Sequence, residues 1–299
     1  MTKILITGAT GFIGSHLTEM CVEKGYDVVA FDRYNPNYNL GWLEKSKFRD
    51  DINFVFGDIR DQDSVLKTMR NCKIVFHLAA LIGIPYSYLS PLAYLKTNVE
   101  GTYNVLESSK SLDVEQTIVT STSEVYGSAK YIPIDEKHPL TAQSPYSASK
   151  ISADQLALSY WNSYQMPIKI VRPFNIYGPR QSSRAVVPSI IIQALSSKKE
   201  IKLGNVKPSR DFTYVTDTCS AFLDIYKSDS LFGEVSNIGM NSEISIGDLV
   251  VMISNLLDKD ITIESSEIAA GVAILPASPE TNAVLFRKLS QTDAALHPD

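Results

Sequence analysis

The sequence predicts an α/β protein built on a doubly wound parallel sheet, followed by a smaller α/β cap. Three observations lead to this prediction. Short β-branched runs alternate with longer stretches of helical spacing, most of the runs are apolar throughout, and the alternation ends after Arg172, where proline and glycine become frequent. Uniformly apolar strands that alternate with helices are typical of parallel sheets covered on both faces.

Six strands are expected before that point, each a short run rich in apolar and β-branched residues. They are Lys3–Thr7, Val28–Phe31, Phe54–Phe56, Ile74–His77, Thr117–Thr120 and Ile168–Val171. Two longer helices are expected at about Val99–Ser111 and Tyr146–Tyr164, where apolar residues recur at helical spacing. Open α/β sheets bind ligands at the carboxyl ends of their strands. We therefore expect residues 173–299 to form a substrate-binding cap there, part of which can return to the sheet.

Composition excludes several classes of protein. The 299 residues are 44% hydrophobic and 20% charged, and the formal net charge of −5 gives no basic footprint for nucleic acid. The three cysteines (Cys21, Cys72 and Cys219) and the four scattered histidines predict reduced thiols and no metal site. No apolar stretch approaches the ~20 residues that span a bilayer, and the N-terminus lacks the long apolar region of a signal peptide. A cytoplasmic protein is expected.

A glycine-rich turn, GATGFIG, directly follows the first expected strand. Glycines at Gly8, Gly11 and Gly14 permit a tight turn and a close approach of the backbone to a pyrophosphate at a helix N-terminus. An ordinary strand-to-helix turn would explain a lone glycine triplet equally well. Asp32, however, follows Gly14 by 18 positions, near the offset of about 20 at which an acidic residue binds the adenosine ribose. Residues 1–172 are therefore predicted to form a Rossmann domain that binds NAD.

The choice between NAD and NADP depends on two neighbouring residues. The carboxylate of Asp32 would repel the 2′-phosphate of NADP, whereas Arg33 could accept it. We expect NAD.

Tyr146 and Lys150 stand at positions i and i+4 of an expected helix, and therefore on one face of it. A nearby positive charge lowers the pKa of an acid by roughly 1–3 units, which would let a tyrosine act as a general base near neutral pH. A surface lysine beside a packed tyrosine would give the same spacing. Because the pair follows a credible dinucleotide turn, we interpret it as catalytic.

Further motifs follow in order: GDI at Gly57–Ile59, HLAA at His77–Ala80, TSTSEVYG at Thr120–Gly127, SPYSASK at Ser144–Lys150 and RPFNIYGPRQ at Arg172–Gln181. Over about residues 1–255 the chain resembles the extended short-chain dehydrogenase/reductase family of nucleotide-sugar epimerases, dehydratases and decarboxylases. The resemblance implies that Lys150 also holds the nicotinamide ribose. It implies cofactor contacts at Gly8, Gly11, Phe12, Ile13, Gly14, Asp32, Asp58, Ile59, Leu78, Ala79, Ala80, Thr97, Tyr146 and Lys150.

The segment Thr122-Ser123-Glu124 discriminates among the reactions of that family. By resemblance, Thr122 binds the sugar O4, and epimerases usually have a small or neutral residue at the position of Glu124. A carboxylate there suits an enzyme that handles a proton on sugar carbon 5. Ser123 is a departure, since hexose-type dehydratases have an aspartic acid at its position; the GDP-mannose dehydratases, which also have Thr-Ser-Glu, leave both proton transfers to the glutamate.

A 4,6-dehydration is therefore the expected reaction, and the flanking sequences look most like dehydratases of the legionaminic-acid type, which act on nucleotide-linked N-acetylglucosamine. UDP is the first choice of carrier and GDP the second. A 4-epimerase and a UDP-glucuronate decarboxylase remain alternatives on the same scaffold, because decarboxylases also carry Thr-Ser-Glu. A catalytically idle dinucleotide-binding protein is a third class, against which Thr122, Tyr146 and Lys150 argue together.

Substrate contacts are implied by the same resemblance. Asn175 would hold the diphosphate, although a turn-forming asparagine would suit its position equally well, and Arg210 would pair with the phosphates. Arg180 and Arg184 are weaker candidates that solvated or structural roles would also explain. The late Arg-Pro pair of the family is replaced by Leu275-Pro276, and its usual final helix start is hard to find in Leu285–Asp299. A homodimer formed through the two long helices is also expected by resemblance.

Overall fold

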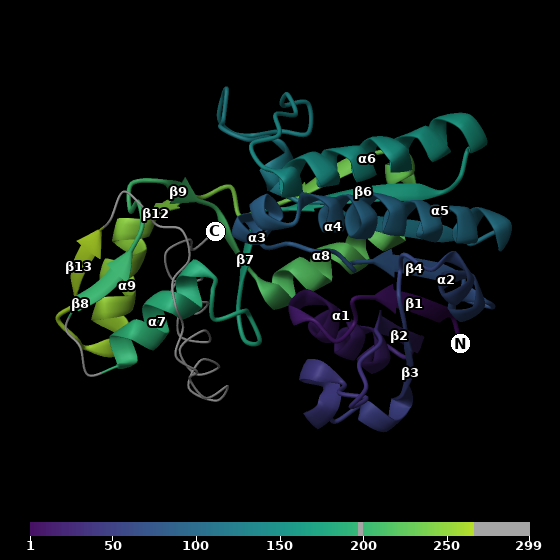
Figure 1. The fold of residues 1–299 in the computed structure, drawn as a ribbon, viewed down its shortest axis with the longest axis horizontal. Helices are drawn as coiled ribbons and strands as arrows, with labels where there is room; N and C mark the ends of the chain where they lie inside the picture. The colour runs from purple at the N-terminus through teal and green to yellow at the C-terminus, as the bar shows by residue number, and fades with distance from the viewer. Residues whose placement is uncertain (197–199, 266–299) are drawn as a thin grey trace. The chain divides into compact units, whose positions relative to one another are not determined.

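Seven parallel strands form the central sheet of the protein, counted over residues 1–196 and 200–265, which the computed structural model describes. The sheet order is β11-β6-β5-β4-β1-β2-β3 (Figure 1). The bounds are Lys3–Thr7 for β1, Asp27–Arg33 for β2, Ile52–Gly57 for β3, Ile74–His77 for β4, Gln116–Thr120 for β5, Ile168–Pro173 for β6 and Val235–Ile238 for β11. From β1 the chain adds β2 and β3 on one side of the sheet, and from β4 it adds β5, β6 and β11 on the other side. This is the doubly wound arrangement, so the expected fold class is confirmed.

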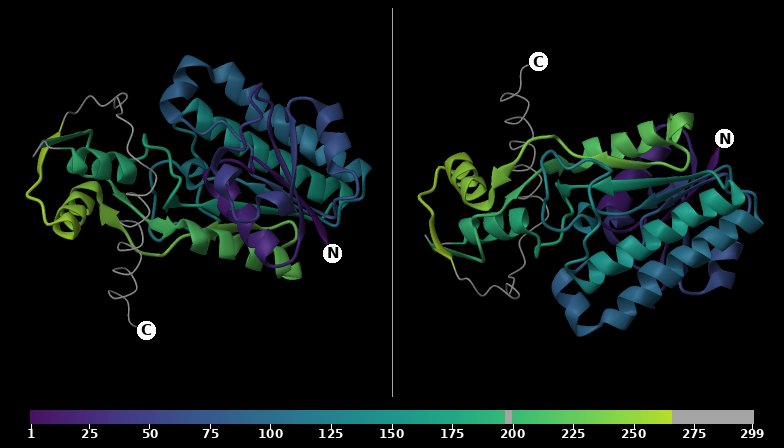
Figure 2. Two further views of the ribbon diagram at one scale, coloured as in Figure 1. Left: turned by 90° about the horizontal axis from the view of Figure 1, so that it is seen from below. Right: turned by 90° about the horizontal axis from the view of Figure 1, so that it is seen from above.

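Helices cover both faces of this sheet (Figure 1, Figure 2). On one face lie α2 (Gln62–Met69), α5 (Gly101–Ser111) and α6 (Pro145–Tyr164), and on the other α1 (Phe12–Glu23) and α8 (Val215–Lys227). Strand β4 shows the alternation, because Val75 packs in the cluster under α2 and α5 while the ring of Phe76 meets Phe222 of α8. Burial on both faces explains why the strands are apolar throughout.

Helix α6 has clear start and stop signals. Ser144 accepts a hydrogen bond from the N–H of Ser147, and Pro145 occupies the first helical position, where its missing N–H costs nothing. Gln165, at φ 54°, ends the helix in the left-handed region. The helix therefore starts within the SPYSASK motif, which places Tyr146 and Lys150 in its first two turns.

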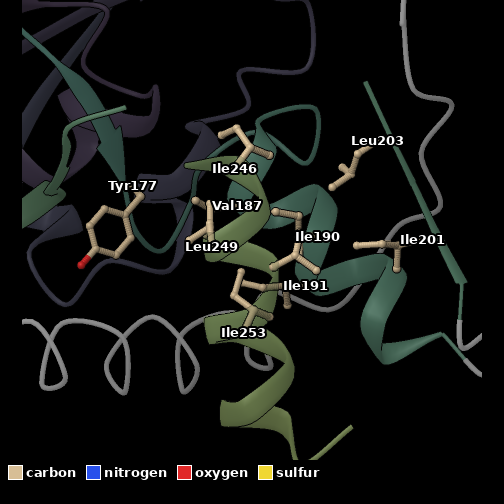
Figure 3. Close-up of a cluster of buried hydrophobic side chains, with 10 residues drawn as sticks. Tyr177, Val187, Ile190, Ile191, Ile201, Leu203, Ile246, Leu249 and Ile253 are labelled. Carbon is tan, nitrogen blue, oxygen red and sulfur yellow. The ribbon is translucent and has the colours of Figure 1, made fainter. Parts of the chain in front are cut away.

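The first compact unit comprises Met1–Phe174 and Thr216–Ile238. The second comprises Asn175–Val215 and the described residues from Gly239 onward. Its elements are β7 (Asn175–Tyr177), α7 (Val186–Leu195), β8 (Glu200–Leu203), β9 (Ser209–Arg210), β10 (Phe212–Tyr214), β12 (Ile244–Ser245), α9 (Ile246–Leu257) and β13 (Thr262–Ser265). Three strand pairs, β7 with β10, β9 with β12 and β8 with β13, border a core in which α7 packs on α9 (Figure 3). Ile190, Ile191 and Ile253 are fully buried in it.

The central sheet contains one strand beyond the six whose positions were expected, and it comes from the later part of the chain, some of which was expected to return to the sheet. Strand β11 returns to the first unit and pairs with β6, with Val235 opposite Ile170.

Among the described residues, Cys21, Cys72 and Cys219 are free and buried, no acidic, histidine or cysteine cluster could hold a metal, and no helix is long and apolar enough to cross a membrane. Leu275-Pro276 and Leu285–Asp299 lie outside the described residues.

Candidate active site

The glycines of the turn between β1 and α1 lie where a side chain would meet the backbone. Gly8 lies at φ 70°, and a Cβ on Gly14 would stand 2.1 Å from the carbonyl oxygen of Gly8. Gly11 precedes α1, no side chain caps that helix, and Phe12 and Ile13 form its first turn. An uncapped helix N-terminus beside bare backbone is the arrangement that binds a phosphate group. The expected glycine residues therefore fit a dinucleotide.

Asp32 holds this turn in position. Its Oδ2 accepts the backbone N–H of Thr10 at 2.9 Å and the Thr10 hydroxyl at 2.5 Å, and its Oδ1 accepts the N–H of Arg33 at 2.7 Å. The carboxylate thus lies at the glycine turn, where an adenosine ribose is bound in Rossmann domains. Thr10 is a residue that the sequence analysis missed, although it stands inside the GATGFIG motif.

The loop after β4 lies directly against the glycine turn. A Cβ on Gly8 would stand 2.9 Å from the amide nitrogen of Ala79. The Thr7 hydroxyl accepts the N–H groups of Leu78 and Ala79, both at 3.1 Å. His77 lies 2.8 Å from that hydroxyl, and burial lowers its pKa to about 3, so it is neutral. Of the expected residues, Leu78 and Ala79 are therefore fixed beside Gly8 by hydrogen bonds to Thr7, and Ala80 follows them in the chain.

Asp58 and Ile59 follow the end of β3. The Arg60 guanidinium donates to both oxygens of the Asp58 carboxylate, from Nε to Oδ1 at 2.9 Å and from Nη2 to Oδ2 at 2.5 Å. These hydrogen bonds lower the pKa of Asp58. Ile59 is buried, its carbonyl oxygen accepts the side-chain amide of Asn104, and a Cβ on Gly101 would stand 2.7 Å from its Cδ1. Both residues are thus held at the carboxyl end of the sheet, next to β2.

Thr97 lies half-buried in a π-helical turn, Leu95–Glu100, between α4 (Pro91–Tyr94) and α5. Turns of this kind are frequent at functional sites. The neighbouring Asn98 is buried and exchanges hydrogen bonds with the backbone of Leu81, at 2.8 and 2.9 Å, while also donating to Ser149 of α6 at 2.9 Å. Asn98, a second residue that the sequence analysis missed, therefore connects the 78–81 loop to the helix of the Tyr/Lys pair.

Tyr146 is buried at the start of α6, with its phenol hydrogen-bonded to Thr122. Its ring meets Tyr94 edge to face, with 6.2 Å between centroids. Burial raises the pKa of Tyr146, and the Thr122 hydrogen bond offsets part of that rise. The sequence suggested a lowered pKa from Lys150. The direction found is the opposite, because helical spacing shows which residues share a face but not how deeply they are buried.

Lys150 is almost completely buried one turn after Tyr146. Its ammonium donates to the carbonyl oxygen of Thr120, at the end of β5, over 2.5 Å. Burial lowers the pKa of Lys150, while the charge of Asp154 raises it. The ammonium is therefore anchored at the carboxyl end of the central sheet.

Glu124 is half-buried in the short turn Ser123–Val125 that follows β5. Its N–H donates to the Thr122 hydroxyl at 3.2 Å, and its carbonyl oxygen accepts the hydroxyl of Ser147 at 2.7 Å. Its negative charge acts on the Tyr146 phenol. The structure thus brings Thr122, Glu124 and Tyr146 together, with Ser123 in the same turn.

The expected substrate residues all belong to the second unit. Strands β7 and β10 run parallel, with Asn175 opposite Phe212. The N–H of Asn175 donates to the carbonyl oxygen of Asp211, the residue after Arg210, at 3.1 Å. Arg210 and Arg184 are exposed, whereas Arg180 is half-buried at φ 72°. An arginine guanidinium is suited to bidentate contact with an anionic group.

Comparison with known proteins identifies relatives of two kinds. Residues 5–289 match the family described as GDP-mannose 4,6 dehydratase. A dTDP-D-glucose 4,6-dehydratase of Homo sapiens is 33% identical over 259 residues, which cover 85% of this chain and 74% of that protein. The structure is similar to dTDP-glucose 4,6-dehydratase of Bacillus anthracis in complex with NAD, with a TM-score of 0.79, 33% identity, and coverage of 89% of this chain and 85% of the other. It is also similar to a UDP-glucuronic acid 4-epimerase of Bacillus cereus solved with NAD, with a TM-score of 0.82, 31% identity, and coverage of 88% and 86%.

Proposed function

The chain belongs to the GDP-mannose 4,6-dehydratase family of NAD-dependent nucleotide-sugar dehydratases and epimerases, and we propose that it is a 4,6-dehydratase acting on UDP-N-acetylglucosamine. One observation carries this proposal. Glu124 adds a half-buried carboxylate to Thr122 and Tyr146, near enough for its charge to act on the phenol. C4 oxidation alone needs no such carboxylate, whereas elimination across C5 and C6 needs a base for the C5 proton.

The cofactor would be held by the glycine turn, by Asp32 and by the loop at Leu78–Ala80, with its diphosphate at the N-terminus of α1, which no side chain caps. When bound, NAD supplies the acceptor for the C4 hydride and returns that hydride to C6. We propose that Asp32 selects NAD over NADP, because its carboxylate repels a 2′-phosphate. The ammonium of Lys150 binds and orients the nicotinamide ribose.

The protein residues move the protons. Tyr146 removes the proton of the sugar 4-hydroxyl, with Thr122 hydrogen-bonded to the phenol and steering the transfer. The resulting 4-ketone acidifies the C5 hydrogen, which Glu124 takes up. Glu124 then protonates the departing 6-hydroxyl, because Ser123 has no acidic proton for that step. The 6-hydroxyl leaves as water, and as the hydride is returned to C6, C5 takes up a proton from solvent while Tyr146 releases its proton to solvent. The product is a 4-keto-6-deoxy sugar, and no NAD is consumed.

Asn175, Arg180 and Arg210 are proposed to bind the diphosphate of the substrate, with the arginine forks suited to bidentate contacts. The reaction is to be followed by proton NMR in deuterated water with UDP-N-acetylglucosamine and no added reductant. We expect a new C6 methyl signal with deuterium at C5. An N-acetylgalactosamine signal without a methyl group would mean a 4-epimerase. No change would reject this substrate, and the GDP-linked sugar would be the next one to test.

We also propose that the protein is a homodimer formed through α5 and α6. On the described surface of these helices and the adjoining π-helical turn, large side chains are exposed: Leu95 is 48% exposed, Tyr103 42% and Tyr164 58%. Clustered exposed apolar groups of this kind are typical of interaction surfaces. Sedimentation at micromolar concentration should give twice the mass of the 33.1 kDa chain. A monomer would contradict the proposal.

A further inference from the structure

Helix α6 carries a second buried charge directly after Lys150. Asp154 follows Lys150 by one turn, so that the two side chains share a face of the helix. The side chain of Asp154 is 0% exposed, and that of Arg172, its partner on β6, is 3% exposed. A charge this deeply buried is costly unless it is paired, so this carboxylate needs a reason to be there.

The two oxygens of Asp154 differ in their surroundings. Oδ2 accepts the hydroxyl of Ser121 at 2.8 Å and Nε of Arg172 at 3.0 Å. Oδ1 is buried and accepts no hydrogen bond from the part of the chain that the structure describes. One carboxylate therefore stands among two buried cations, Arg172 and Lys150, but only Arg172 is hydrogen-bonded to it.

Asp154 and Lys150 also hold neighbouring residues of the chain. Lys150 donates to the carbonyl oxygen of Thr120, and Asp154 accepts from the hydroxyl of Ser121. Thr120 ends β5, and Ser121 follows it and leads directly into Thr122. The carboxylate and the ammonium are thus directed to the same point of the sheet, from consecutive turns of α6.

We propose that Asp154 is a positioning residue that keeps the Lys150 ammonium charged and directed toward the carboxyl end of β5, ready for the nicotinamide ribose of NAD. Burial raises the pKa of Asp154, and the charge of Arg172 offsets part of that rise. Arg172 in turn donates a hydrogen bond from Nη1 to the Tyr126 hydroxyl at 3.1 Å. The inference rests on the proposed role of Lys150 in binding NAD.

The charges around Lys150 support this assignment. Asp154 is the charge that raises the pKa of Lys150 against the lowering effect of burial. His77, on β4, is neutral over the working range because its pKa is about 3. Tyr146, on the same helix, has a raised pKa, and Glu124 acts on Tyr146. Removing the charge of Asp154 should therefore let Lys150 lose its proton at lower pH.

The test is the affinity for NAD, measured by calorimetry as a function of pH with no sugar present. Affinity should fall at alkaline pH as Lys150 is deprotonated. In Asp154→Asn the midpoint of that fall should move to lower pH by about one unit or more, the shift expected from losing a nearby opposite charge. Ser121→Ala is the matched control, since it removes a neutral hydrogen bond to the same oxygen and should keep the wild-type midpoint. Repeating the comparison with Tyr146→Phe excludes ionisation of the phenol.

Two results would overturn the proposal: an affinity of the wild type that is independent of pH, or a midpoint that does not move in Asp154→Asn. If the single variant fails to fold, the double variant D154L/R172M replaces the ion pair with apolar side chains, an exchange that buried pairs often tolerate. It should show the same downward shift, and a wild-type midpoint in it would reject the proposal. A wrong sugar substrate leaves this test intact, because no sugar takes part.

Discussion

Glu124→Gln should abolish formation of the C6 methyl group while C4 oxidation continues. The amide has the size of the carboxylate but cannot accept the C5 proton, and general base catalysis contributes about 10²–10⁴-fold to a rate. We expect exchange of the C5 hydrogen to fall by that factor. NADH, followed at its own absorbance with UDP-N-acetylglucosamine present, should still form, because Tyr146 and Thr122 are unchanged.

Glu115→Gln provides a matched control for this variant. Glu115 precedes β5 at the amino end of the sheet, where it forms an exposed ion pair with Lys73, whereas Glu124 follows the same strand at its carboxyl end. Exposed pairs contribute little to stability, so this variant should turn over like the wild type. Wild-type C5 exchange in Glu124→Gln would show that another group takes the proton. The reaction would then have to be reconsidered as an epimerisation or a decarboxylation.

The strand, turn and helix around Gly8 could be predicted because their signals are local. The strand-turn-helix pattern around Gly8 and the offset of Asp32 depend on residues that are close in sequence, and both stand where they were expected. Thr10 was missed although it lies in the same motif. The reason is that its contact with Asp32 spans 22 positions and exists only once β1 and β2 pair.

Contacts between distant segments account for the remaining differences. Strand β11 is short and half polar, and it is a strand because β6 is there to pair with it. Asp154 appeared as one more polar residue of a helix, and Arg172 as the end of a strand. Only the fold reveals that they meet in the interior, with side chains 0% and 3% exposed. Burial of this kind also reversed the expected direction of the Tyr146 pKa shift.

These differences bear on catalysis. A tyrosine whose pKa is raised by burial needs help to act as a base. In this chain the hydrogen bond with Thr122 offsets part of that rise, and Lys150 follows one turn later on the same face of α6. The proposed role of Asp154 concerns Lys150, whose pKa its charge raises, since the same charge also raises the pKa of Tyr146. A lysine that lost its charge in the interior could neither bind the ribose nor favour the phenolate. The proposed function of Lys150 therefore depends on the carboxylate of Asp154 as well as on the Tyr146/Lys150 spacing.

Tyr146→Phe should lower the rate of C4 oxidation by about 10²–10⁴-fold, the contribution of a positioned general base. The variant keeps the ring and its edge-to-face contact with Tyr94, so the fold should be preserved. Rapid mixing of the NAD complex with UDP-N-acetylglucosamine would measure this step as the rise of NADH. Because C4 oxidation precedes every later step, methyl formation should fall with it, unlike in Glu124→Gln.

Tyr164→Phe is the control on the same helix. Tyr164 lies at the opposite end of α6 and is 58% exposed. The substitution removes the same phenol oxygen there as Tyr146→Phe removes at the start of the helix. It should oxidise the sugar at the wild-type rate. If Tyr146→Phe also retained that rate, the phenol could not be the base, and Glu124 would be the remaining ionisable group of the cluster able to take the 4-hydroxyl proton. Tyr146→Phe and Glu124→Gln therefore assign the first and the second proton transfer separately. Tyr146→Phe stops NADH formation, whereas Glu124→Gln stops only the exchange of hydrogen at C5.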